Sequence, residues 1–155
     1  MSLSTLQSLI KARLESHAYF AGTEYSPARP ISIISEDRHD IDNEIEQAIA
    51  QIGLAVVIKM PALKNLEPAR LPANSVVEVL IRVGENVLVN RDENNATATL
   101  KHCSDVALAV MRRLHQWRPD TAWARVECVE IAPEEDPALQ IYTVRLTTQT
   151  LLAPL

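Results

Sequence analysis

The chain has 155 residues, of which 47% are hydrophobic and 23% are charged, and its formal net charge is −5. This length and composition suit one domain with a substantial core and argue against disorder over most of the chain. A net acidic chain does not suit general nucleic-acid binding, which depends on neutralising phosphates with Lys and Arg. No apolar run approaches the roughly 18 residues that cross a membrane, and the amino terminus lacks a signal-peptide pattern, so we expect a cytosolic protein.

The first third of the chain predicts a helix, a strand, a second helix and a second strand. An amphipathic helix is expected over 5–17, within an N-terminal helical segment spanning 1–22. Residues 31–35 predict a short strand. A helix is expected over 41–52, with Gly53 as its C-terminal stop, and the apolar run 54–60 predicts a strand near the middle of a sheet.

The middle of the chain carries the two strongest signals. Residues 61–74 contain three prolines and predict a long connection or an exposed arm. Residues 76–83 alternate between apolar and charged side chains, which predicts a strand with one core face and one wet face. A long amphipathic helix is expected over 100–117, lying across the sheet, capped by Thr97 or Thr99 and stopped by Pro119.

Two strands near 123–131 and 139–148 complete the predicted elements. The segment 132–137 between them predicts a hairpin with an acidic tip, and 149–155 forms a C-terminal tail that is loose or joins a neighbouring subunit. The element order predicts a single α+β domain over 1–155. Its sheet is mixed or largely antiparallel, with about five strands, two helices packed on it and an N-terminal helix.

Few residue patterns suggest chemistry. The three glycines are dispersed, so glycine-rich phosphate loops are excluded, and no Gly-x-Ser-x-Gly nucleophile motif is present. Cys103 and Cys128 lie on predicted core faces, where small buried hydrophobes are expected rather than a disulfide. Asp37, His39 and Asp40 offer ligand types for a divalent cation, but a charged, solvated approach to a helix start explains the same residues without a metal and is the favoured interpretation. We therefore predict no enzyme activity, no metal and no cofactor.

A set of sequence patterns then points to a family. The patterns lie at 36–41, 53–57, 79–83, 85–86, 90–91, 105–110, 114–117 and 139–148. Together they cover nearly the whole chain, and they resemble the small bacteriophage and prophage tail-terminator and tail-completion proteins. This is the broad group that includes lambda-like minor tail proteins and head-to-tail joining proteins. The likeness rests on packing and loop patterns, without a catalytic signature.

The resemblance implies a structural virion protein. Such a protein forms a homo-oligomeric ring, commonly hexameric, that caps the tail tube, stops its polymerisation and offers a surface to the head–tail connector protein. It is assembled in the host bacterial cytoplasm and belongs to the tail of the virion, and DNA passes through it without specific binding or any membrane contact.

Two groups of residues are predicted to serve that ring. Polar residues between rigid elements are expected at contacts with a neighbouring subunit or with the tail tube protein: Glu85, Asn86, Asn90, Arg91, Lys64 and Arg70. The acids Glu134, Glu135 and Asp136 are expected to line the channel, because acidic walls repel the phosphates of passing DNA.

Two other function classes stay open at the level of the sequence. A small-ligand-binding or regulatory α+β domain would be a dimer with a pocket, and a metal-dependent enzyme would use Asp37, His39 and Asp40. Fold does not separate these classes, whereas oligomeric state and metal content do.

Overall fold

The computed structural model describes residues 2–37, 41–64 and 75–151, and they form an α+β fold with a six-stranded mixed sheet. The expected fold class is confirmed. In chain order the elements are α1 (Leu3–Glu15), α2 (Ala18–Ala21), β1 (Ser32–Ser35), α3 (Ile41–Gln51), β2 (Leu54–Ile58), β3 (Ala62–Lys64), β4 (Val76–Glu85), α4 (Val87–Asn90), α5 (Cys103–Leu114), β5 (Glu127–Glu134) and β6 (Gln140–Gln149).

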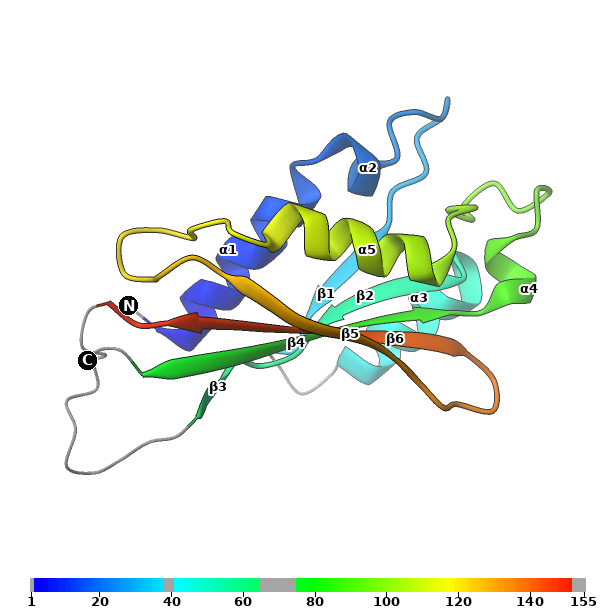
Figure 1. Ribbon diagram of the computed structural model, residues 1–155. Coiled ribbons are helices and arrows are strands. Elements are labelled where there is room, and N and C mark those ends of the chain that lie inside the picture. The colour runs from blue at the N-terminus through cyan, green and yellow to red at the C-terminus, as the bar shows by residue number, and fades with distance from the viewer. Residues whose placement is uncertain (1, 38–40, 65–74, 152–155) are drawn as a thin grey trace.

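The sheet has the strand order β1-β2-β4-β6-β5, and β3 pairs with β4 beyond the end of β2 (Figure 1). β1 and β2 are parallel, with α3 as the crossover between them, and every other pair is antiparallel. β2 is buried along its whole length because it lies between β1 and β4. This confirms its prediction as an inner strand.

The main core lies between one face of the sheet and the helices α1 and α5, which Figure 1 shows on the same side of the strands. Residues of β4 alternate between buried and half-buried positions, as the sequence pattern predicted. Val79 and Ile81 pair with Leu146 and Val144 of β6, and α5 packs over both strands. The long helix therefore lies across the sheet, as expected.

The opposite face of the sheet is covered only in part. There α3 packs on β1 and β2, and a small cluster of Ile34, Ile41, Ala48 and Ala55 forms a second core. Among the described residues, no other helix packs on this face, so the part formed by β3, β4, β6 and β5 is left uncovered. This uncovered part carries the charged side chains of β4, which matches its predicted wet face.

The long helix begins later than the sequence predicted. α5 starts at Cys103 with His102 as N-cap, so neither Thr97 nor Thr99 caps it. The hydroxyl of Thr99 instead donates to Asn90 Oδ1 at 2.5 Å, and the following residue, Leu100, has a φ of 60° that no helix continues through. The buried hydrogen bond between Thr99 and Asn90 therefore outweighs the helical spacing of the apolar residues, and the helix starts later than that spacing predicted.

The strand before the hairpin also differs from its prediction. β5 begins at Glu127 because Trp123, expected within the strand, is buried in the core and bridges to Thr150. At the other end, Pro133 and Glu134 belong to β5, so the turn is shorter than the predicted 132–137 tip.

The predicted arm and tail are described only in part. The arm predicted at 61–74 contains β3, and its remainder, 65–74, lies outside the described residues. Of the predicted tail, Thr150 is buried against the domain, and 152–155 lies outside the described residues. No helix of the described residues is long and apolar enough to span a membrane.

Candidate functional site

The polar segment after β4 is built around a buried carboxylate. Glu85, the last residue of β4, has no exposed surface. Its Oε2 accepts from Asn90 Nδ2 at 2.7 Å and from Arg91 Nε at 3.1 Å. Its Oε1 accepts from Arg91 Nη2 and from the backbone N–H of Cys103, both at 3.1 Å. The carboxylate therefore ties β4 to α4 and to the first turn of α5.

The charge of Glu85 is stabilised by these donors. Burial alone raises the pKa of the Glu85 carboxyl, but the hydrogen bonds from Arg91, Asn90 and the Cys103 N–H outweigh it, so the pKa lies below its ordinary value. The same contact raises the pKa of the Arg91 guanidinium. Glu85 and Arg91 thus form an ion pair whose acid is buried and whose base is half-exposed.

This arrangement changes what the sequence suggested for the segment 85–91. Glu85 and Asn90 are both buried within the subunit, where Asn90 also bonds Thr99 and the carbonyl of Lys101, so their observed role is internal. Asn86 and Arg91 reach the surface. Their predicted role at a subunit or tube contact stays a prediction.

The uncovered part of the sheet carries a network of exposed ion pairs, which we call the charged face. Glu78 lies between Lys64 and Arg145, at 3.5 and 3.6 Å. Arg145 also approaches Glu130, and Arg82 bonds Glu134 at 2.7 Å. Acids and bases alternate across β3, β4, β6 and β5, so both signs of charge are presented together.

Two predicted site residues belong to the charged face. Lys64 pairs with Glu78 on this face, and its predicted role at a subunit or tube contact stays a prediction. Glu134 lies in β5 rather than at the hairpin tip, and the hydroxyl of Thr143 and the guanidinium of Arg82 hold its pKa below the ordinary value. Arg70, the other predicted contact residue of the arm, lies outside the described residues.

Exposed pairs of this kind are expected to contribute little to the stability of the subunit. Replacing Glu134 by Gln should lower the free energy of unfolding by less than about 1 kcal/mol, because solvent screens the pair with Arg82. Urea unfolding measures this, with Glu130→Gln as the matched variant on the same strand. A loss of several kcal/mol would show that the charged face is part of the folding core.

The hairpin between β5 and β6 ends in an acidic tip, formed by Glu135 and Asp136. Both side chains are exposed, and Asp136 accepts from the backbone N–H groups of Ala138 and Leu139 at 2.9 Å. These bonds lower the pKa of Asp136 and hold the turn. The tip is therefore negatively charged and accessible, and its predicted place on a channel wall stays a prediction.

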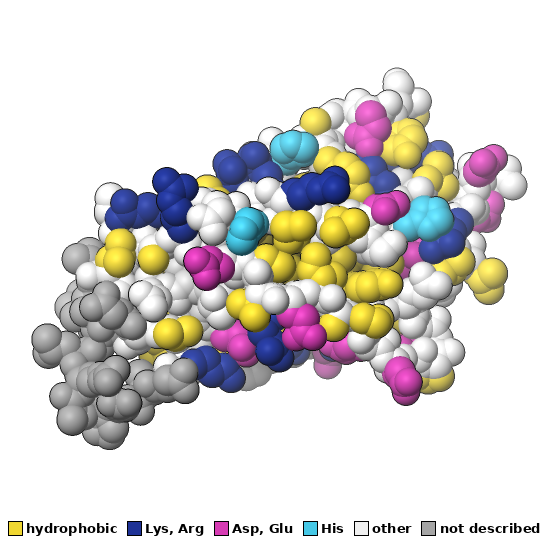
Figure 2. Space-filling view, in the orientation of Figure 1, with side chains coloured by type: hydrophobic (Ala, Val, Ile, Leu, Met, Phe, Trp, Pro, Cys, Tyr) yellow, Lys and Arg dark blue, Asp and Glu magenta, His cyan; other side chains and the backbone are white. Residues whose placement is uncertain are grey.

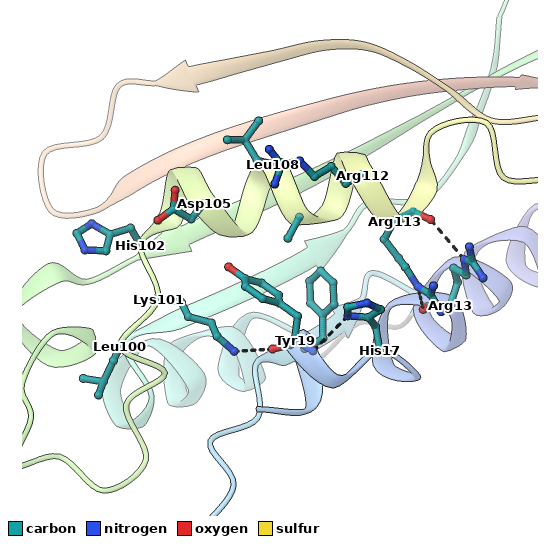
Figure 3. Close-up of a pocket in the computed structure, with 12 residues that line it drawn as sticks. Arg13, His17, Tyr19, Leu100, Lys101, His102, Asp105, Leu108, Arg112 and Arg113 are labelled. Carbon is teal, nitrogen blue, oxygen red and sulfur yellow. Dashed lines mark hydrogen bonds between the residues drawn. The ribbon is translucent and has the colours of Figure 1, made fainter. Parts of the chain in front are cut away.

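A cleft of about 700 Å³ lies between α1, α2 and α5, on the helical side of the molecule. Figure 3 shows three arginines at one end of it, Arg13 from α1 and Arg112 and Arg113 from α5, which we call the arginine cluster. Phe20, Leu108 and Ala109 add apolar surface. Leu108 is 39% exposed, whereas Leu114, the other leucine of α5, is fully buried.

The other end of the cleft is electrically balanced. Lys101 pairs with Glu24 at 2.5 Å, donates to the carbonyl of Tyr19 and lies over the Tyr19 ring (Figure 3). Burial and the nearby carboxylates of Asp105 and Glu24 raise the pKa of the Tyr19 hydroxyl to about 12. Excess positive charge is therefore concentrated at the arginine cluster.

The residues considered for metal and thiol chemistry do not form a site in the described part of the chain. Among those residues, no group of three His, Cys, Asp or Glu side chains could hold a metal ion. Asp37 is exposed, and His39 and Asp40 lie outside the described residues. Both cysteines are free thiols. Burial, with the nearby Glu85 carboxylate, raises the pKa of the Cys103 thiol to about 12, which suits a packing role.

The sequence matches no protein-family model and no curated protein. One solved structure, named only by a sequence identifier, aligns with a TM-score of 0.46 and 15% sequence identity, over 96% of this chain and 98% of that chain. A likeness at this level carries no argument about function, so the function is inferred from the residues themselves.

The arginine cluster was not predicted from the sequence. Arg13 and Arg113 are far apart in the chain, and each lies on a helix whose apolar stripe dominates the pattern. The sequence signal that could have revealed the cluster is the basic residues at the ends of both helices. Arg13 lies in the last turn of α1, and Arg112 and Arg113 lie in the last turn of α5. Only the packing of α1 beside α5 brings these ends together.

Proposed function

We propose that this chain is a structural assembly protein of a bacteriophage or prophage tail, which forms a homo-oligomeric ring that caps the tail tube and joins it to the head connector. The sequence resemblance suggests this role, and the observation that carries it is the charged face. An uncovered sheet surface across β3, β4, β6 and β5, with both signs of charge, suits contact with a neighbouring copy or with the tube protein.

The subunit has its own buried core, separate from the charged face, and this supports the proposal. The described subunit buries a complete core under α1 and α5 and a smaller one under α3, so the subunit can fold before it assembles. The pairs of the charged face contribute little to that folding and can exchange partners with a neighbour. Polar contacts of this kind give specificity and orientation to subunits that associate after folding.

The net charge of the chain supports a position near passing DNA. The chain as a whole carries a charge of −5. Acidic side chains on a channel wall repel phosphates, so DNA slides through without being held. Glu134, bound on the charged face, is better suited to a subunit contact than to the channel.

The growth of tail tubes tests the proposed function. Tube protein is allowed to polymerise with and without this chain at substoichiometric amounts, and tube length is followed by light scattering and negative-stain electron microscopy. We expect short tubes whose growth stops, because one ring per tube end is sufficient for termination.

A charge-reversal variant makes the test specific. Arg145→Glu should weaken termination because it reverses a charge in the centre of the charged face, whereas Arg125→Glu reverses an exposed charge outside that face and should terminate as the wild type does. Unrestricted tube growth with the wild-type chain, together with a compact dimer in solution, would contradict the proposal and favour the ligand-binding alternative.

A further inference from the structure

The arginine cluster lacks a counter-charge within the described part of the chain. Arg13 Nε donates to the carbonyl of Arg113 at 3.3 Å, and Arg113 Nε donates to the carbonyl of Arg13 at 3.1 Å. These reciprocal bonds lock the two side chains beside each other (Figure 3). No carboxylate of the described residues forms an ion pair with either arginine or with Arg112.

Holding like charges together costs free energy that an anion would recover. Desolvation and the neighbouring Arg113 guanidinium lower the pKa of Arg13. Arg112, one residue from this pair, extends the positive surface beside the exposed Leu108. The cluster therefore suits a partner with carboxylates and some apolar surface.

The acidic tip of this same chain has those properties. Glu135 and Asp136 are adjacent and exposed, and Pro137 and Ala138 follow them as small exposed apolar residues. Glu135 has no hydrogen-bond or ion-pair partner among the described residues, so its carboxylate is free to bind elsewhere. Figure 2 shows basic side chains along the upper border of this face, on the helical side, and acids and bases together along the lower border.

We infer that the acidic tip of one copy binds the arginine cluster of the next copy, so that subunits join head to tail. This inference rests on the proposed ring and adds the contact that would build it. The carboxylates of Glu135 and Asp136 pair with Arg112 and the locked Arg13–Arg113 pair, and the apolar residues after them pack against Leu108 and Ala109.

The two surfaces lie near opposite ends of α5. Cys103, at the start of α5, bonds the carbonyl of Gln140, just after the hairpin turn, at 3.5 Å. Arg113 lies ten residues further along α5, about 15 Å at 1.5 Å per residue. Figure 1 shows the hairpin turn beyond the start of α5 and the cluster end of the helix on the other side. A tip cannot bind its own cluster, so the contact joins two copies. A head-to-tail contact of this kind builds a ring when the rotation between neighbouring subunits closes.

The energetics predict a weak contact that ring closure reinforces. Exposed ion pairs are individually weak because solvent screens them, so an isolated contact should dissociate readily and weaken with salt. In a closed ring every subunit makes the contact twice, and the effective concentration of the last joining surface is high. The subunit should therefore associate steeply with concentration at low salt.

Two single charge reversals test this contact. Arg112→Glu and Glu135→Arg change side chains that have no partner within the described residues, so the subunit should fold normally in both. Glu93→Arg reverses an exposed acid away from both surfaces and serves as the control. Sedimentation velocity over a concentration series, at low and at high salt, measures the association of each variant and of their mixtures.

We expect each reversal to weaken association at least about tenfold, because an attractive pair becomes repulsive, while Glu93→Arg leaves it unchanged. An equimolar mixture of Arg112→Glu and Glu135→Arg should associate as strongly as the wild type, since each reversed charge then meets its opposite. Three results would overturn the contact. They are variants that associate as strongly as the wild type, a mixture whose association is not restored, and a wild type that stays monomeric at every concentration.

The outcomes separate this inference from the proposed function. Tubes that are capped equally by the wild type and by both reversals would overturn the contact and leave the ring proposal intact. Charge-dependent association together with uncapped tubes would support the contact and remove the tail role. Inorganic phosphate that binds the cluster without affecting association would assign the arginines to a small anion and overturn the contact.

Discussion

Replacing Glu85 by Ala is expected to lower the free energy of unfolding by about 3–5 kcal/mol, the range for removing one partner of a buried ion pair. The substitution leaves the Cys103 N–H and the Asn90 amide without the carboxylate that accepts from them, and it removes the anion that faces Arg91. Chemical denaturation of the purified chain measures the loss. Glu93→Gln, an exposed acid of the same region, is the control and should change stability by less than about 0.5 kcal/mol.

The same residue predicts a pH dependence. The pKa of Glu85 is lower in the folded chain than in the unfolded one, so the folded state favours the charged form. Its contribution is present above the unfolded pKa of about 4.3 and is lost as pH falls through the folded pKa. The wild type should therefore lose stability more steeply than Glu85→Ala below about pH 4.3. Parallel pH profiles for the two proteins would show that the pKa of Glu85 is the same in the folded and the unfolded chain.

Replacing Gly53 by Ala is expected to destabilise the fold by about 3 kcal/mol or more, through backbone strain and a steric clash. Gly53 has a φ of 84°, which ends α3, and an added Cβ would lie 2.3 Å from the backbone nitrogen of Asn90. That nitrogen belongs to the segment that holds the Glu85 network, so the clash cannot be relieved by moving a flexible side chain. The melting temperature of the variant measures the effect.

Gly84→Ala is the matched control for this substitution. Gly84 lies in β4, and an added Cβ would meet only Ile49 Cδ1 at 3.9 Å, an ordinary van der Waals contact. We expect its melting temperature to equal or slightly exceed that of the wild type, since alanine restricts the unfolded chain. If both substitutions lower the melting temperature equally, the close approach of Gly53 to Asn90 is not the cause of the destabilisation at position 53.

The fold could be predicted from the sequence where periodicity is strong. The alternation in β4 and the stripe of α5 each determine which face is buried, and the apolar run of β2 predicts burial on both faces. The structure confirms all three. Boundaries failed where a tertiary contact outweighs the local pattern. Thr99 binds Asn90 instead of capping α5, and Trp123 packs in the core instead of starting β5.

The candidate site could be predicted less well, for a physical reason. A polar residue at the end of a strand normally faces solvent. Nothing near Glu85 in the sequence shows that donors from three residues, Asn90, Arg91 and Cys103, surround it. The arginine cluster depends on two helices whose sequence separation is large. Local spacing carries no information about which helix ends meet.

Electron microscopy of tail-tube ends tests the ring proposal most directly. Tubes of tail protein are incubated with an excess of this chain, and the two ends of each tube are imaged and averaged. We predict a closed ring, hexameric as the resemblance implies, at one end only, with the opposite end bare. Tubes with both ends bare at saturating concentration of a folded chain would contradict the proposed function.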